Sequence, residues 1–373
     1  MAKRIYTGVN GVARRVRKIY VGINGVARKV KKIYVGINNI ARSVFTSEPD
    51  LFDTMDLSYP AADLAGASVG NYALFAGGSV RKTDQSDIYG HVVAFDNHLI
   101  KMSSPGGLNT PVDDLAGASV GNYAVFAGGK DIHYAPISFV SAYNTSLTRQ
   151  NPQELQQARS NLAGASVGNY AVFAGGVDQY SWYFYNQIDA YNSNLTRYTN
   201  SLSTARSELA GASVGNYVLF AGGRDNNNAA VDYVDAFNES LTSQRYLHLY
   251  VSRSLLAGAS VGNYALFAGG VDSNYGELNT VDIFDSHLTR LTPGVMRSSR
   301  CNLAGVSVNG YAIFAGGGNG VDVYDTSLTR SNPKNLTFYR HNLAGASVSN
   351  YALFACGWNF SSTWSNTIDV YET

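Results

Sequence analysis

Cysteine, tryptophan and proline are scarce in this 373-residue chain, which contains two, three and eight of them. Two thiols, Cys301 and Cys356, cannot build a disulfide framework, which excludes a small disulfide-held fold. No apolar run approaches the roughly 18 residues that a membrane-spanning helix needs. The N-terminus is basic but lacks a continuous apolar segment, which argues against a signal peptide.

Acidic residues are absent from residues 1–45, a segment with eleven Lys and Arg side chains. Residues 46–373 contain 17 basic and 27 acidic side chains, a net charge of −10. This division of charge predicts two parts with different partners. We expect a basic arm over residues 1–45 and one large domain over residues 46–373.

The large domain is built from a repeated segment, Leu-Ala-Gly-Ala-Ser-Val, that occurs seven times with little change. A period near 50 residues with several strands per unit is typical of a β-propeller. Each unit contains a strand of small residues, a Gly-Asn or Asn-Gly hairpin turn, an apolar strand, a Gly-Gly pair, a variable loop and a third strand. The sequence therefore predicts an all-β, seven-bladed propeller. The repeats begin at Leu64, Leu115, Leu162, Leu209, Leu256, Leu303 and Leu343.

The last unit ends at Thr373 after its third strand, so its outer strand is missing. In the other units a large apolar residue lies seven positions before the next repeat leucine, and Leu57 stands in this relation to Leu64. The stretch Leu51–Leu57 is therefore predicted to supply the missing strand. It would close the ring and remove two open sheet edges.

Five units pair an arginine three residues before the leucine with an aspartate in the third strand, and the other two units have neither. We interpret these as buried ion pairs between the first and third strands of a blade, because a lone buried charge costs about 3–5 kcal/mol. A ring of arginines that binds anionic ligands is the alternative. The residues are Arg159, Asp189, Arg206, Asp235, Arg253, Asp282, Arg300, Asp322, Arg340 and Asp369.

One face of the predicted propeller carries the loops between strands two and three. These loops differ in length and sequence between units, whereas the turns of the opposite face are nearly constant. They are rich in Tyr, Trp, Asn, Ser and Asp, residue types that suit antibody-like recognition and sugar binding. Packing of these rings over the core is the structural alternative. The predicted binding residues are His133, Tyr134, Tyr180, Trp182, Tyr183, Tyr185, Asp225, Asn226, Asn274, Tyr275, Trp358 and Trp364.

Signals for catalysis are poor. The six histidines are scattered, and we find no metal-ligand spacing, nucleophile elbow or phosphate loop. We expect a binding protein rather than an enzyme, without a cofactor or a bound metal.

The arm contains three 14-residue repeats, Arg4–Arg17, Lys18–Lys31 and Lys32–Phe45. Asn10-Gly11 and Asn24-Gly25 lie between β-forming residues and predict hairpins, which we expect to join into a small β-meander. So short a segment buries little apolar surface, so it should dock onto a partner or onto copies of itself. Binding to nucleic acid is not favoured, because charged and apolar residues alternate.

Both parts of the chain resemble known proteins. The Gly-Gly pair followed by Val/Ile-Asp-x-Tyr/Phe-Asp/Asn, as in residues 222–238, resembles kelch repeats over residues 50–373. The seventh unit departs with Cys356-Gly357, and the family's usual fourth-strand tryptophan is missing. This resemblance implies a propeller that binds partners, although a minority of such propellers are enzymes. The arm, with Lys18–Arg28 as its clearest repeat, resembles tail-associated structural proteins of phages and prophages of Gram-positive bacteria.

These observations lead to one hypothesis and two alternatives. We expect a virion or phage-tail-like particle protein, made in the bacterial cytoplasm, whose arm binds other tail proteins, with a homotrimer as the expected oligomer. Its propeller would recognise a bacterial surface glycan or protein, with no membrane span. The first alternative is a protein–protein scaffold within a larger assembly, and the second is a carbohydrate-active propeller enzyme.

Overall fold

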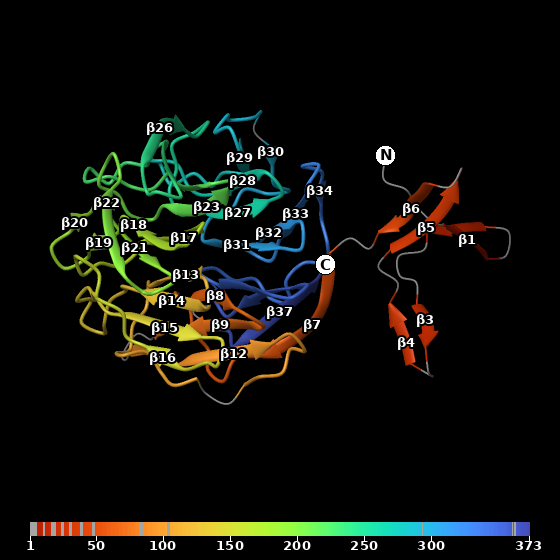
Figure 1. The fold of residues 1–373 in the computed structure, drawn as a ribbon, viewed down its shortest axis with the longest axis horizontal. Coiled ribbons are helices and arrows are strands. Elements are labelled where there is room, and N and C mark those ends of the chain that lie inside the picture. Colours follow the sequence, from red (N-terminus) through yellow and green to blue (C-terminus); the bar gives the residue numbers. More distant parts are fainter. Residues whose placement is uncertain are drawn as a thin grey trace. The chain divides into compact units, whose positions relative to one another are not determined.

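The computed structural model describes residues 6–9, 12–15, 20–23, 26–29, 32–37, 40–46, 49–81, 86–102, 105–292, 294–359, 361 and 363–373. The chain divides into two compact units, residues 1–50 and residues 51–372, which we describe separately. All regular elements of the described residues are β-strands (Figure 1). None of those residues forms a helix long and apolar enough to cross a membrane.

The first unit consists of β-hairpins, as the Asn-Gly signals predicted. Strand β1 (Tyr6–Val9) pairs with β2 (Val12–Arg15), β3 (Tyr20–Ile23) with β4 (Val26–Lys29), and β5 (Lys32–Ile37) with β6 (Ile40–Thr46). The described strands form three separate two-stranded sheets, so the expected meander is wrong. Each hairpin pairs residues of its own repeat, as in the pairing of Thr7 with Arg14 and of Val21 with Arg28.

The second unit is a seven-bladed β-propeller, as predicted, with its sheets arranged around a common centre (Figure 1). The inner strands are β8 (Ala65–Val69), β13 (Ala116–Val120), β17 (Ala163–Val167), β23 (Ala210–Val214), β27 (Ala257–Val261), β31 (Leu303–Val308) and β35 (Ala344–Val348). The second strands are β9 (Tyr72–Ala76), β14 (Tyr123–Ala127), β18 (Tyr170–Ala174), β24 (Tyr217–Ala221), β28 (Tyr264–Ala268), β32 (Tyr311–Gly316) and β36 (Tyr351–Ala355).

The third strands are β12 (Val92–Asp96), β15 (Val140–Asn144), β21 (Gln187–Asn192), β25 (Tyr233–Asn238), β29 (Thr280–Asp285), β33 (Val321–Asp325) and β37 (Thr367–Glu372). The outer strands of blades two to six are β16 (Arg149–Gln150), β22 (Arg197–Ser201), β26 (Ser243–His248), β30 (Gly294–Val295) and β34 (Arg330–Ser331). In the first blade an isolated bridge, Phe95 to Lys101, takes the place of this strand. Two short hairpins lie in loops, β10 (Ser79–Arg81) with β11 (Ser86–Ile88) and β19 (Val177–Asp178) with β20 (Tyr183–Phe184).

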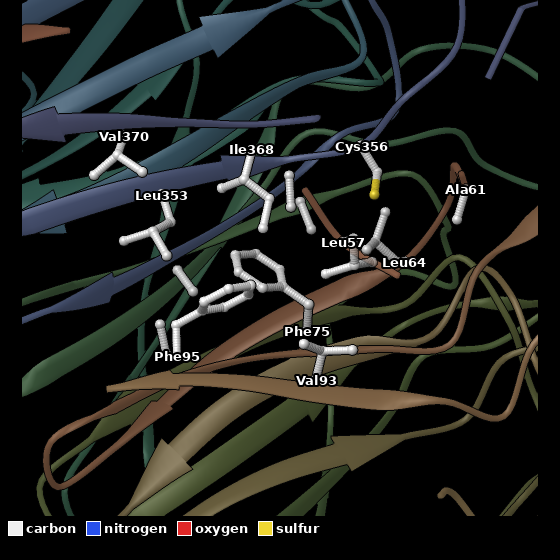
Figure 2. Packing of buried hydrophobic residues seen from close by; sticks show 14 of the residues in the cluster. Leu57, Ala61, Leu64, Phe75, Val93, Phe95, Leu353, Cys356, Ile368 and Val370 are labelled. Carbon is white, nitrogen blue, oxygen red and sulfur yellow. The ribbon is translucent and has the colours of Figure 1, made fainter. Parts of the chain in front are cut away.

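The ring closes as predicted. Strand β7 (Asp50–Asp56) is the fourth strand of the sheet β35-β36-β37-β7, so the front of the domain completes the last blade. Leu57 follows it, is 1% exposed, and its N–H donates to the Asn366 carbonyl at 2.7 Å. Figure 2 shows Leu57 packed with Phe75 of the first blade and Ile368 of the last. The first and last blades therefore share one apolar core.

The small residues of the inner strands allow neighbouring blades to approach closely. A Cβ added to Gly117 would lie 2.4 Å from the carbonyl oxygen of Gly66 in the preceding blade. Next along the strand, the Ser119 hydroxyl donates to the Ser68 carbonyl at 2.7 Å. The repeated Gly-Ala-Ser therefore serves blade-to-blade packing around the centre.

Candidate functional site

Each of the five repeat arginines forms an ion pair with the aspartate of its own blade. The closest N–O distances are 2.9 Å for Arg159–Asp189, 2.7 Å for Arg206–Asp235, 2.7 Å for Arg253–Asp282, 2.5 Å for Arg300–Asp322 and 2.5 Å for Arg340–Asp369. All ten residues are buried. Burial lowers the pKa of each guanidinium, and its aspartate counteracts that shift.

The arginines precede the first strand rather than lie in it, which corrects the expected placement and shows what the pairs do. The Arg253 carbonyl accepts the Gly223 N–H of the preceding blade at 2.9 Å, while its guanidinium donates to the Phe267 carbonyl of the next blade at 3.0 Å. The partner Asp282 also accepts the Tyr250 N–H at 2.9 Å. Each pair thus stabilises the link between two blades, and burial leaves none of these five arginines available to an anionic ligand in solvent.

The loop face predicted to bind a partner exposes many of its aromatic and polar side chains. The rings of Tyr180, Trp182 and Tyr275 are 81%, 72% and 65% exposed. In the aromatic run of the third blade, the Phe184 side chain is buried, whereas its neighbours Trp182 and Tyr183 are exposed. The exposed predicted residues are His133, Tyr134, Tyr180, Trp182, Tyr183, Asn226, Asn274 and Tyr275, while Tyr185, Asp225, Trp358 and Trp364 are partly buried.

The channel mouth lies on this same face, because the inner strands begin there. The residue before each repeat leucine donates its backbone N–H to its counterpart in the preceding blade at 2.9–3.1 Å, which closes a ring around the centre. Above the leucines these residues line a cavity of ≈ 220 Å³, and a second cavity of ≈ 290 Å³ follows the inner strands. The ring residues are Asp63, Asp114, Asn161, Glu208, Leu255, Asn302 and Asn342.

Two ion pairs beside the mouth were missed by the sequence reasoning. Lys130 is 2% exposed and binds Asp114, while Arg224 is 4% exposed and binds Glu208 at 3.0 Å. In both blades the base follows the Gly-Gly pair, 16 residues after the acid. Comparison of equivalent positions in units two and four would have revealed them.

Neither cysteine has the environment of a reactive thiol. Burial raises the pKa of Cys301 to about 12, and the Glu277 carboxylate adds to this shift. Burial likewise raises the pKa of Cys356 to about 12. Among the described residues, no group of three or more His, Cys, Asp or Glu side chains could hold a metal ion.

Comparisons with known proteins support the fold and nothing beyond it. No family model matches the chain, and no curated protein matches it. Of the solved structures that match, one is a structure of YjhT, with a TM-score of 0.57 and 12% sequence identity. The match covers 75% of this chain and 99% of YjhT. At this identity the likeness supports the propeller architecture and carries no activity across.

Proposed function

We propose that this chain is a structural protein of a phage or phage-tail-like particle, and that the varied face of its propeller recognises the surface of a bacterium. The observation that carries the proposal is the exposure of Tyr180, Trp182 and Tyr275 on the loop face around the channel mouth. Large rigid rings beside short polar side chains suit recognition of a partner.

The arm attaches the protein to the particle. Its three hairpins carry the excess of positive charge, and two-stranded sheets of this size are marginally stable alone, which favours docking onto an acidic partner. The resemblance of its repeats to tail-associated proteins supports the same assignment. Mass spectrometry of purified particles from a strain that encodes the chain should detect it, and particles without it would contradict this part of the proposal.

Binding of the full chain to intact Gram-positive cells and to isolated walls tests recognition. Trp182→Ala should weaken binding at least about tenfold with the fold intact, because buried aromatic contacts dominate binding energies. Tyr198→Ala is the matched control, since Tyr198 is 43% exposed but lies on outer strand β22. Equal binding by wild type and Trp182→Ala would move the receptor site elsewhere, and no binding by wild type would favour the protein–protein scaffold.

A carbohydrate-active enzyme is the second candidate, because the mouth cavity holds three carboxylates, Asp63, Asp114 and Glu208. Two of them are engaged by Lys130 and Arg224, which suits a structural role better than acid–base catalysis. Release of reducing ends from bacterial walls by the full chain, lost in Asp63→Asn, would favour the enzyme over the binding protein.

A further inference from the structure

One turn design occurs on both faces of the propeller. On the uniform face, the turn between strands three and four begins with Asp or Asn, as at Asp285 in blade five. The Oδ1 of Asp285 accepts the N–H groups of His287 and Thr289 at 2.9 Å each. Between them, Leu288 has a positive φ of 61°.

The varied face uses the same design in blades two, four and five, and the same pair of hydrogen bonds occurs in blade seven. The Oδ1 of Asp272 accepts the N–H groups of Asn274 and Gly276 at 2.8 and 2.9 Å, and Tyr275 has a φ of 63°. The turns at residues 131–135 and 225–229 repeat this pattern. In blade seven, the Oδ1 of Asn359 likewise accepts the N–H groups of Ser361 and Thr363 at 3.0 and 3.1 Å. The expectation that the loops of this face differ in length from blade to blade is therefore wrong for blades two, four and five, whose loops differ in side chains on one backbone frame.

The residue at positive φ differs in kind between the faces. Left-handed backbone is unfavourable for a bulky residue, and Gly or Asn tolerates it best. On the uniform face this position is leucine, and burial offsets the strain, since Leu241 and Leu288 are 9% and 6% exposed and the other four leucines are partly buried. On the varied face Tyr134 and Tyr275 occupy it while 51% and 65% exposed.

Two further observations separate these aromatic residues from scaffold. Trp182, in the longer loop of blade three, also combines a positive φ of 54° with 72% exposure. The Arg224 guanidinium lies 4.5 Å from the centre of the Tyr275 ring, and Lys130 lies 5.8 Å from that of Tyr134. A buried cation behind an exposed ring restricts the ring before any ligand arrives, which lowers the entropy lost on binding.

The neighbouring side chains indicate the class of ligand. Ser181 and Asn274 directly precede Trp182 and Tyr275 in the chain, and Asn226 and Asn227 lie in the varied loop of blade four. All four are exposed, neutral hydrogen-bonding groups. Aromatic faces with amides and hydroxyls complement the C–H faces and hydroxyls of a neutral sugar.

We propose that Tyr134, Trp182 and Tyr275 are the contact residues of a glycan-binding face, kept at strained backbone positions for binding rather than for stability. This inference rests on the proposed function, because it names the ligand class of the same face.

Stability of the full chain gives the first test. Tyr275→Asn should leave the Tm unchanged or raise it, because Asn relieves the strained position, as Asn228 does in blade four. The matched control is Leu288→Asn in the equivalent turn of the uniform face, which should lower the Tm by at least about 4 °C. A loss for Tyr275→Asn as large as that for Leu288→Asn would make the tyrosine structural and overturn the inference.

Binding of the same full-length variants to isolated Gram-positive walls gives the second test. Tyr134→Asn, Trp182→Asn and Tyr275→Asn should each weaken binding at least about tenfold. Periodate treatment of the walls, which cleaves vicinal diols of sugars, should abolish binding, and protease treatment should not.

Three results would count against the inference, and they can be told apart. Variants that bind walls as well as wild type does would refute the role of these three residues as ligand contacts, but they would not contradict the proposed function. Binding that survives periodate treatment of the walls but is lost after protease treatment would show that the ligand is a protein and not a glycan. Failure of wild type itself on every wall would refute the proposed function, and the inference with it.

Discussion

Single residues decide how the blades are fastened together. Replacing Arg253 by Val removes the closest charged partner of the buried Asp282 carboxylate, at 2.7 Å. The carboxylate keeps the Tyr250 N–H at 2.9 Å and the Arg290 guanidinium at 3.5 Å. We expect Arg253→Val to lower the free energy of unfolding by about 3–5 kcal/mol, because the buried Asp282 carboxylate loses its closest and fully buried partner.

The double variant Arg253→Val/Asp282→Ser is the matched control, because it reproduces the Val112 and Ser141 that occupy these positions in blade two. Removal of both charges should restore part of the lost stability. Urea unfolding monitored by circular dichroism measures both variants, and a double variant less stable than the single one would contradict the ion-pair account.

At the scale of elements, strand β7 decides whether the ring closes. Deletion of residues 1–57 removes both β7 and the anchor Leu57, and it leaves the edge of β37 unpaired. We expect this variant to self-associate through the open edge, because unpaired backbone groups are a template for another strand. Deletion of residues 1–48 retains the strand and is the control. Size-exclusion chromatography with light scattering would decide, and a monodisperse, equally stable 58–373 chain would refute the closure argument.

The elements also show what sequence could and could not predict. The closing strand and the Arg–Asp pairs were predictable because the seven units can be compared position by position. A strand missing from one unit, or a charge present in five of them, is then easily recognised. Lys130 and Arg224 escaped notice because their pairs occur in only two units. The shared frame of the loops escaped notice because it is set by backbone φ and by Asp Oδ1 acceptors, which hydrophobic periodicity does not record. Pairing within each arm repeat was predicted, but its restriction to single repeats was not.

At the scale of the molecule, the separation of charge predicts association that depends on salt. Residues 1–45 carry eleven basic side chains and no acid, while residues 46–373 carry a net charge of −10. At low ionic strength the arm of one copy should bind the acidic propeller of another. This association should disappear near 1 M salt, where the Debye length falls to about 3 Å.

Analytical ultracentrifugation of the full chain between about 0.01 and 1 M salt measures this effect, with residues 49–373 as the control that should stay monomeric throughout. Association that is independent of salt concentration and yields a trimer would instead indicate that the apolar residues of the hairpins drive the assembly. A full chain that stays monomeric at every salt concentration would show that the arm's charge is directed at a different, acidic partner, which is where the search for its binding site on the particle should then begin.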